Sequence, residues 1–124
     1  MIQKKKVLII DDDSRNIFAL SAILRARGFQ CVSAPGAAEG IDLLNNDAEI
    51  GIVLMDMMMP DMDGYEAIDE IRSNVKIAQV PIIAVTAQAM LGDREKALAA
   101  GADNYTSKPI DIDFLTEILN EHLT

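Results

Sequence analysis

Short apolar runs alternate with segments of helical period along the chain, and this alternation limits the fold more than any other feature. Residues 7–10 (VLII) form a continuous aliphatic run, as expected for a strand buried on both faces. Further strands are predicted at residues 31–34, 50–55, 82–85 and 104–106. Helices are predicted at residues 14–27, 37–46, 63–73 and 93–100, and from about residue 111 onward.

Capping signals support these helix boundaries. Gly28 follows the first helical segment and is a typical C-terminal stop, and Gly101 ends the fourth helix in the same way. Asp63 and Glu66 have the spacing of a capping box, which predicts a helix start at this point. The elements are therefore defined by end signals as well as by periodicity.

Five alternations of strand and helix predict an α/β protein with a parallel sheet covered on both faces. Right-handed crossovers place helices on either side of such a sheet, as in the doubly wound folds. Ligands of these folds bind beyond the carboxyl ends of the strands. We therefore expect the functional residues at that edge.

The composition fits one globular domain that spans residues 1–124. The net charge of −9 argues against direct nucleic-acid binding, which needs a basic surface. No apolar run approaches the roughly 18 residues that a membrane span requires, and no signal peptide is recognisable. We expect a cytoplasmic protein without membrane insertion, in which Cys31 is a buried, unreactive thiol.

Four of the five predicted strands end next to residues that suit phosphate or metal chemistry. These residues are Asp11, Asp12 and Asp13 after the first strand, Asp56 after the third, Thr86 after the fourth and Lys108 after the fifth. The carboxyl ends of parallel strands lie at one edge of a sheet, so these side chains are expected to form one site.

Electrostatics narrow the chemistry of such a site. Two carboxylates about 4 Å apart repel by roughly 4 kcal/mol at an effective dielectric near 20. A cluster of this kind holds a cation or has raised pKa values. Hard oxygen ligands at an open edge favour Mg²⁺ over Zn²⁺. A metal, the charge of Lys108 and the hydroxyl of Thr86 around one carboxylate suit phosphoryl transfer, with the carboxylate as nucleophile.

Over almost its whole length the chain resembles the response regulator receiver domains. The resemblance rests on four motifs in order: VLIIDDD at residues 7–13, VLMDMMMPDMDG at 53–64, IIAVTA at 82–87 and GADNYTSKP at 101–109. It implies the flavodoxin-like strand order 2-1-3-4-5. It also implies that Asp11, Asp12, Asp56 and the main-chain carbonyl of Met58 bind Mg²⁺, with Mn²⁺ as a substitute.

The same resemblance assigns the phosphorylation chemistry and the partners. Asp56 is implied to be the phosphoacceptor, Thr86 and Lys108 to bind the phosphoryl group, and Thr86 with Tyr105 to form the switch. A sensor histidine kinase or a histidine phosphotransfer protein is implied as the donor, and an output protein or fused domain as the receiver of the signal. The resemblance thus implies a signalling switch without a separate substrate, and not an enzyme.

Several residues also have plain structural interpretations. Asp13 is better explained as the cap of the first helix than as a metal ligand. Tyr105 fits a simple core position as well as a switch. Met58 is expected at the mouth of the site beside Gln88, whereas the neighbouring methionines fill gaps in the core. His122 is expected to be solvated, and the Lys108–Pro109 bond is a candidate for the cis form.

The sequence disfavours three other functions. A phosphatase of the haloacid-dehalogenase type would need a second acid two residues after Asp56, where Met58 stands. A flavodoxin-like cofactor site would need hydroxyls and amides where the three aspartates lie. A receiver without phosphorylation is disfavoured by the complete set of site residues. Both a free-standing receiver and one excised from a larger chain remain open. Residues 13–16 (DSRN) faintly resemble receivers fused to hybrid kinases.

Overall fold

The computed structural model describes residues 4–60, 62–87 and 91–123, and within them five strands alternate with five helices. The strands are β1 (Lys6–Ile10), β2 (Gln30–Ala34), β3 (Ile50–Asp56), β4 (Ile82–Thr86) and β5 (Asn104–Ser107). The helices are α1 (Ser14–Ala26), α2 (Ala37–Asn46), α3 (Gly64–Ser73), α4 (Asp93–Ala100) and α5 (Ile112–His122).

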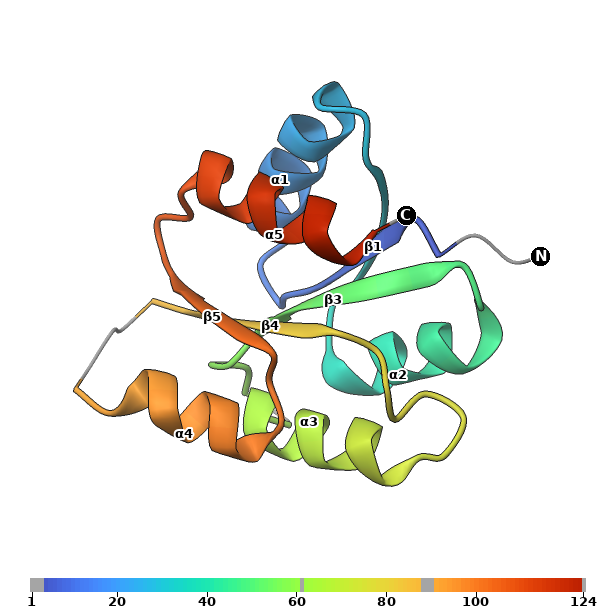
Figure 1. Cartoon of the computed structure of the whole chain (residues 1–124), viewed down its shortest axis with the longest axis vertical. Coiled ribbons are helices and arrows are strands. Elements are labelled where there is room, and N and C mark those ends of the chain that lie inside the picture. The colour runs from blue at the N-terminus through green and yellow to red at the C-terminus, as the bar shows by residue number, and fades with distance from the viewer. Residues whose placement is uncertain (1–3, 61, 88–90, 124) are drawn as a thin grey trace.

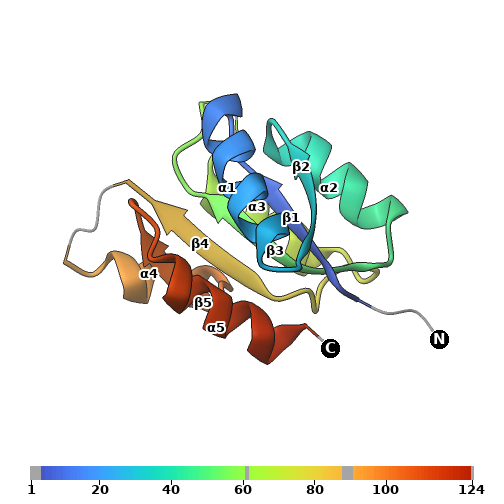
Figure 2. The ribbon, with the colours of Figure 1, turned by 90° about the horizontal axis from the view of Figure 1, so that it is seen from above.

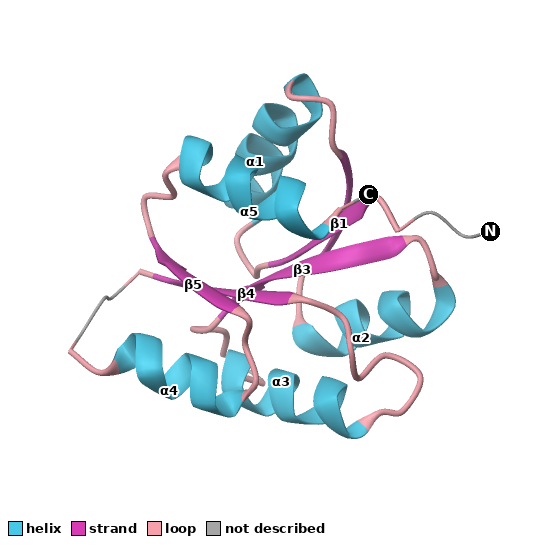
Figure 3. Ribbon diagram, in the orientation of Figure 1, coloured by secondary structure: helices cyan, strands magenta, loops and turns pink. Residues whose placement is uncertain are grey.

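All four strand pairings are parallel, and the strands follow the order β2-β1-β3-β4-β5. This order confirms the predicted doubly wound sheet. Helices α1 and α5 cover one face, and α2, α3 and α4 cover the other (Figures 1 and 3). Seen from above, the strands run side by side with the helices in front and behind (Figure 2). The order reverses between β1 and β3, which creates the switch point where ligands bind.

Alternating residues of the strands supply two separate apolar layers. Leu8 of β1 and Val53 of β3 are fully buried on the side of α2, α3 and α4. Their chain neighbours Val7 and Ile52 are equally buried on the side of α1 and α5. Because both faces of the central strands are covered, these strands read as continuous apolar runs in the sequence.

Side-chain caps set the helix starts. The carboxylate of Asp13 accepts the Arg15 N–H at 2.9 Å, and that of Asp63 accepts the Glu66 N–H at 2.9 Å. Asp111 caps α5 in the same way. Gly28 and Gly101 follow helix ends with φ of +95° and +120°, a region that favours glycine. The predicted starts and stops agree with the structure within one residue.

The boundaries differ from the sequence-based ones in small ways. β3 includes Asp56 and β5 includes Ser107, because main-chain pairing continues to these residues. Cys31 is buried, and burial raises the pKa of its thiol, in agreement with the predicted inert role. Among the described residues no helix is both long and apolar enough to cross a membrane.

Candidate functional site

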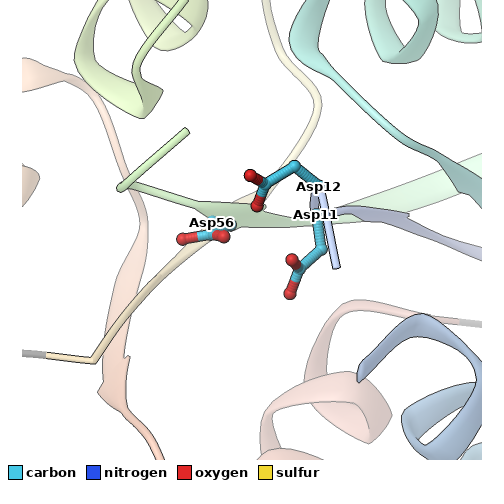
Figure 4. A group of neighbouring side chains, drawn as sticks. All are labelled: Asp11, Asp12 and Asp56. Atoms are coloured by element: carbon cyan, nitrogen blue, oxygen red, sulfur yellow. The ribbon is translucent and has the colours of Figure 1, made fainter. Parts of the chain in front are cut away.

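Three carboxylates meet at the carboxyl ends of β1 and β3. Oxygens of Asp11, Asp12 and Asp56 all lie within 4.8 Å of one another. Asp11 and Asp56 are buried, with 7% and 6% of their surface exposed, whereas Asp12 is open to solvent. Figure 4 shows the three side chains converging from the two strand ends. The register that pairs Ile10 with Met55 brings the residue after β1 beside the last residue of β3.

Main-chain donors orient the two buried carboxylates. The N–H of Asp13 donates to Oδ1 of Asp11 at 2.9 Å, and the N–H of Met58 donates to Oδ1 of Asp56 at 3.0 Å. Each donor lies two residues after its acceptor, so the loops that follow the strands supply them. The two acids therefore have preset orientations.

Lys108 adds a cation to this cluster. Its Nζ lies 3.4 Å from Oδ2 of Asp11 and 3.8 Å from Oδ2 of Asp56. The Lys108–Pro109 peptide bond is cis, as anticipated. The main-chain N–H of Lys108 donates to the carbonyl of Thr86 at 2.7 Å, which ties the end of β5 to the end of β4.

The pKa of Asp56 is raised above its ordinary value. Burial is the largest cause, and the neighbouring Asp11 adds to it. The Met58 N–H and the Lys108 ammonium act in the opposite direction without cancelling the effect. One ammonium among three carboxylates leaves an excess of negative charge in a partly buried place. All three side chains offer hard oxygen donors, so the site suits a divalent cation such as Mg²⁺.

Thr86 and Tyr105 share a second, smaller cavity of about 180 Å³ beside the acid cluster. Thr86 is buried at the end of β4, and Tyr105 on β5 is half-buried. The Tyr105 hydroxyl is buried and has no hydrogen-bond partner among the described residues. The predicted switch pair therefore lines one cavity, and the tyrosine hydroxyl lies inside the fold.

A mostly apolar cleft of about 550 Å³ opens on the other side of the acids. Asp11, Asp56 and Lys108 line it together with Leu20 and Ile23 of α1 and residues at the start of α5. The cleft thus leads from the surface beside α1 to the buried carboxylates.

The remaining residues singled out in the sequence are not among the three clustered acids. Asp13 caps α1 and is not one of the three clustered acids, as expected. Met58 is 56% exposed, and its expected neighbour Gln88 lies outside the described residues. His122, expected to be solvated, is half-buried in the last turn of α5. Tyr65 and Lys96 were not singled out from the sequence, because their positions in the second cavity depend on how α3 and α4 pack.

Comparison with known proteins identifies the family. Residues 7–120 match the response regulator receiver domain. Hybrid signal transduction histidine kinase I of Dictyostelium discoideum is 37% identical over 96% of the chain, which spans only 7% of that kinase. The polar-differentiation response regulator DivK of Brucella ovis is 29% identical, with 96% of each protein covered.

Solved structures agree with this match. A response regulator receiver protein from Pseudomonas putida has a TM-score of 0.90 at 29% identity and covers 98% of the chain and 100% of its own. The receiver domain of the sensor histidine kinase PA1611 from Pseudomonas aeruginosa, with a coordinated magnesium ion, has a TM-score of 0.84 at 33% identity, with 98% of each covered.

A third structure, the complex of the Saccharomyces cerevisiae phosphotransfer protein Ypd1 with the Ssk1 receiver domain, has a TM-score of 0.84 at 26% identity. This match covers 98% of the chain and 90% of its counterpart. The fold, the strand-end acids and these matches agree: the chain belongs to the response regulator receiver domains.

Proposed function

We propose that Asp56 accepts a phosphoryl group from a phosphohistidine of a sensor histidine kinase or a histidine phosphotransfer protein. Receiver domains are signalling domains of two-component phosphorelays. The observation that carries the proposal is the buried Asp56 carboxylate with two further acids and Lys108 around it. A carboxylate used as a nucleophile gives an aspartyl phosphate.

The residues present fit a divalent ion. Asp11, Asp12, Asp56 and the main-chain carbonyl of Met58 would hold Mg²⁺, with Mn²⁺ as a substitute. The fit is supported by the convergence of the carboxylate oxygens and by the raised pKa of Asp56, and a related receiver domain contains magnesium in its active-site cleft. Bound there, the ion supplies positive charge that offsets the negative charge of the acids and of the phosphoryl group.

Main-chain and side-chain groups of this chain carry out the transfer itself. The Met58 N–H fixes the orientation of the Asp56 carboxylate. An oxygen of Asp56 forms the new bond to phosphorus while the bond from phosphorus to the histidine nitrogen breaks, and that nitrogen keeps the electron pair. Lys108, beside Asp56, stabilises the transferred charge, and the Thr86 hydroxyl binds the phosphoryl group after transfer.

The apolar cleft beside α1 supports the proposal that the donor protein approaches along this helix. Phe18 and Ile23 of this helix are 78% and 41% exposed, and Ile23 lines the cleft that reaches Asp56. Exposed apolar side chains beside a reactive group are typical of a protein interface. The Ssk1 receiver domain, which has a similar fold, is known in complex with the phosphotransfer protein Ypd1.

Thr86 and Tyr105 are proposed to report the phosphorylated state to a downstream output protein or fused domain. Their shared cavity supports this role, since a displacement of Thr86 changes the space next to the tyrosine ring. A single receiver unit at residues 1–124, the lack of a separate enzymatic substrate and a cytoplasmic location stay predictions.

The test is phosphate uptake from acetyl phosphate and from a phosphorylated phosphotransfer protein, in the presence of Mg²⁺. The wild-type chain is expected to gain an acid-labile and base-labile phosphate, and Asp56→Asn is expected to gain none. Asp69→Asn, an exposed change of the same charge on α3, serves as the control. Undiminished label on Asp56→Asn contradicts the proposal, and steady turnover of small phosphomonoesters favours an enzyme instead.

A further inference from the structure

The cleft beside α1 has a charged inner end and a wall of different chemistry. The charged residues that line it are Asp11, Asp56 and Lys108. The residues that α1 contributes have the spacing of one helix face, and they are Asn16, Ala19, Leu20 and Ile23. Among the described residues that line the cleft, Asn16 is the single uncharged one whose side chain donates hydrogen bonds. The cleft thus contains one neutral polar contact on an otherwise apolar wall.

Asn16 is the α1 residue of this wall that lies nearest to the acids along the chain. Helix α1 begins at Ser14, soon after Asp11, so Asn16 belongs to its first turn. Ile23 lies about two turns further along the helix. The polar contact therefore stands at the acid end of the wall, and the apolar contacts continue away from it.

A short series of hydrogen bonds fixes this first turn relative to a buried acid. The N–H of Asp13 donates to the carboxylate of Asp11 at 2.9 Å, and the N–H of Arg15 donates to the carboxylate of Asp13 at 2.9 Å. The N–H of Ile17 donates to the carbonyl of Asp13 at 3.1 Å. The residues on both sides of Asn16 are thus held, so its main-chain position relative to Asp11 is preset.

The side chain of Asn16 is not used to hold the fold. It is exposed, and its amide makes no hydrogen bond within the part of the chain that the structure describes. The ammonium of Lys108, in contrast, already lies 3.4 Å from Asp11 and 3.8 Å from Asp56. The amide N–H groups of Asn16 are therefore available to a molecule that enters the cleft.

Phosphoryl transfer creates a new hydrogen-bond acceptor on the donor side of this cleft. The attacking and departing atoms lie on opposite sides of phosphorus, so the departing nitrogen of a phosphohistidine faces away from Asp56. When the bond from phosphorus to this nitrogen breaks, the electron pair stays on the nitrogen while the other ring nitrogen keeps its proton. The ring leaves as a neutral imidazole, and its new lone pair accepts a hydrogen bond.

We propose that the amide of Asn16 donates a hydrogen bond to the departing histidine nitrogen and so favours phosphohistidine over donors with weakly basic leaving groups. This inference rests on the proposed phosphoryl transfer to Asp56. An imidazole nitrogen is more basic than a carboxylate oxygen by roughly two pKa units, so it accepts the stronger hydrogen bond. The amide supplies this contact without adding a charge beside the acids, and the apolar part of the wall suits the carbon atoms of the ring.

Two small phosphodonors that differ in their leaving group test the contact. N-phosphoimidazole releases an imidazole, whereas acetyl phosphate releases a carboxylate. Phosphate uptake at saturating Mg²⁺ is measured for the wild-type chain and for Asn16→Leu, which keeps the size of the side chain and removes the donor. Asn120→Leu is the matched control, because Asn120 is an exposed asparagine of α5 that does not line the cleft.

Loss of the hydrogen bond should lower the rate of uptake from N-phosphoimidazole roughly three- to tenfold in Asn16→Leu. Uptake from acetyl phosphate should change less than about twofold, and Asn120→Leu should match the wild-type chain with both donors. Asn16→Gln keeps the amide and should be faster than Asn16→Leu with N-phosphoimidazole. An Asn16→Gln variant as slow as Asn16→Leu overturns the hydrogen bond.

The other outcomes separate this inference from the proposed function. Equal slowing with both donors places Asn16 against the phosphoryl group and overturns the leaving-group contact, as does no slowing with either donor. A lower Mg²⁺ affinity of Asn16→Leu in an NMR titration assigns the amide to the metal site and also overturns it. No uptake by the wild-type chain from either donor refutes the phosphoryl transfer itself, whereas the other results refute only the role of Asn16.

Discussion

The ammonium of Lys108 lies 3.8 Å from the carboxylate of Asp56, although the two residues belong to the ends of different strands. The same ammonium lies 3.4 Å from Asp11 and is thus shared between two buried acids. One shared cation does not balance three carboxylates, so the charge of this site changes with metal, with protons and with phosphate. Metal binding and the pH dependence of stability should both reflect this imbalance of charge.

Magnesium binding should depend on Asp12 and not on its neighbour Asp13. Asp12 belongs to the group of clustered acids, whereas Asp13 accepts the Arg15 N–H as a helix cap. We expect Asp12→Ala to weaken Mg²⁺ binding roughly tenfold or more. Asp13→Ala should leave the Mg²⁺ affinity nearly unchanged and lower the free energy of unfolding by about 1 kcal/mol. NMR titration measures the Mg²⁺ affinity of both variants, and urea unfolding measures the stability of Asp13→Ala. Shifts away from the strand ends, or equal losses of affinity, contradict the site.

Asp56→Asn should stabilise the metal-free chain at neutral pH. The pKa of Asp56 is raised in the folded state, mainly by burial, so the folded state binds more protons than the unfolded state. Stability contributed by this group therefore falls as the pH rises from the ordinary carboxyl value of 3.8 through the raised folded pKa. The side chain of the asparagine variant does not titrate, so this loss of stability with rising pH is absent from it.

Urea unfolding in EDTA across that pH range measures the difference. Asp69→Asn on the surface of α3 should keep the wild-type pH profile. Excess Mg²⁺ should stabilise the wild-type chain and not Asp56→Asn, because the ion binds only the folded site. An Asp56→Asn variant that is less stable than wild type at neutral pH refutes the predicted effect of burial.

Thr86→Ala should accept phosphate and yet transmit little of the change. A charge-assisted hydrogen bond between the Thr86 hydroxyl and the phosphoryl group contributes roughly 1.5–3 kcal/mol, enough to shift a two-state population by one or two decades. Amide shifts across residues 91–112 on phosphorylation should therefore shrink strongly in Thr86→Ala. Thr86→Ser should restore them.

Thr106→Ala is the matched control for that experiment, because Thr106 is also a buried strand threonine and pairs with Val85 on the neighbouring strand. It should respond to phosphorylation like wild type. A response of Thr86→Ala equal to that of wild type means that the signal takes another route.

Arg72→Met should lower the free energy of unfolding by about 2–4 kcal/mol, because three main-chain carbonyls lose a charged donor. The carbonyls belong to the end of α4 and to the loop before β4. Urea denaturation measures the effect, and Arg94→Met, at an exposed position of α4, should change stability by less than roughly 0.5 kcal/mol. An equally small change in the free energy of unfolding for Arg72→Met would contradict the prediction and show that water replaces the arginine as the hydrogen-bond donor.

Much of the fold follows from local pattern. The apolar run at residues 7–10 and the helical spacing after it predict β1 and α1, since periodicity reflects which faces of one element are covered. Asp13, Asp63 and Asp111 mark helix starts because a cap acts on the N–H groups that follow it within three residues. Parallel strands then bring the acids at residues 11, 12 and 56 to one edge without further information.

Contacts between elements were decided only by the tertiary structure. The sequence does not show that Asp11 is buried while Asp12 is exposed, because this depends on how the loop after β1 turns. Nor does it show that Lys96 meets the ring of Tyr65, or that Tyr105 buries a hydroxyl without a partner. Helical period specifies which residues share a face, but the rotation and spacing of two packed helices come from the whole core. The sequence by itself therefore determined the elements and the acidic site, and tertiary packing decided which side chains line the two cavities beside that site.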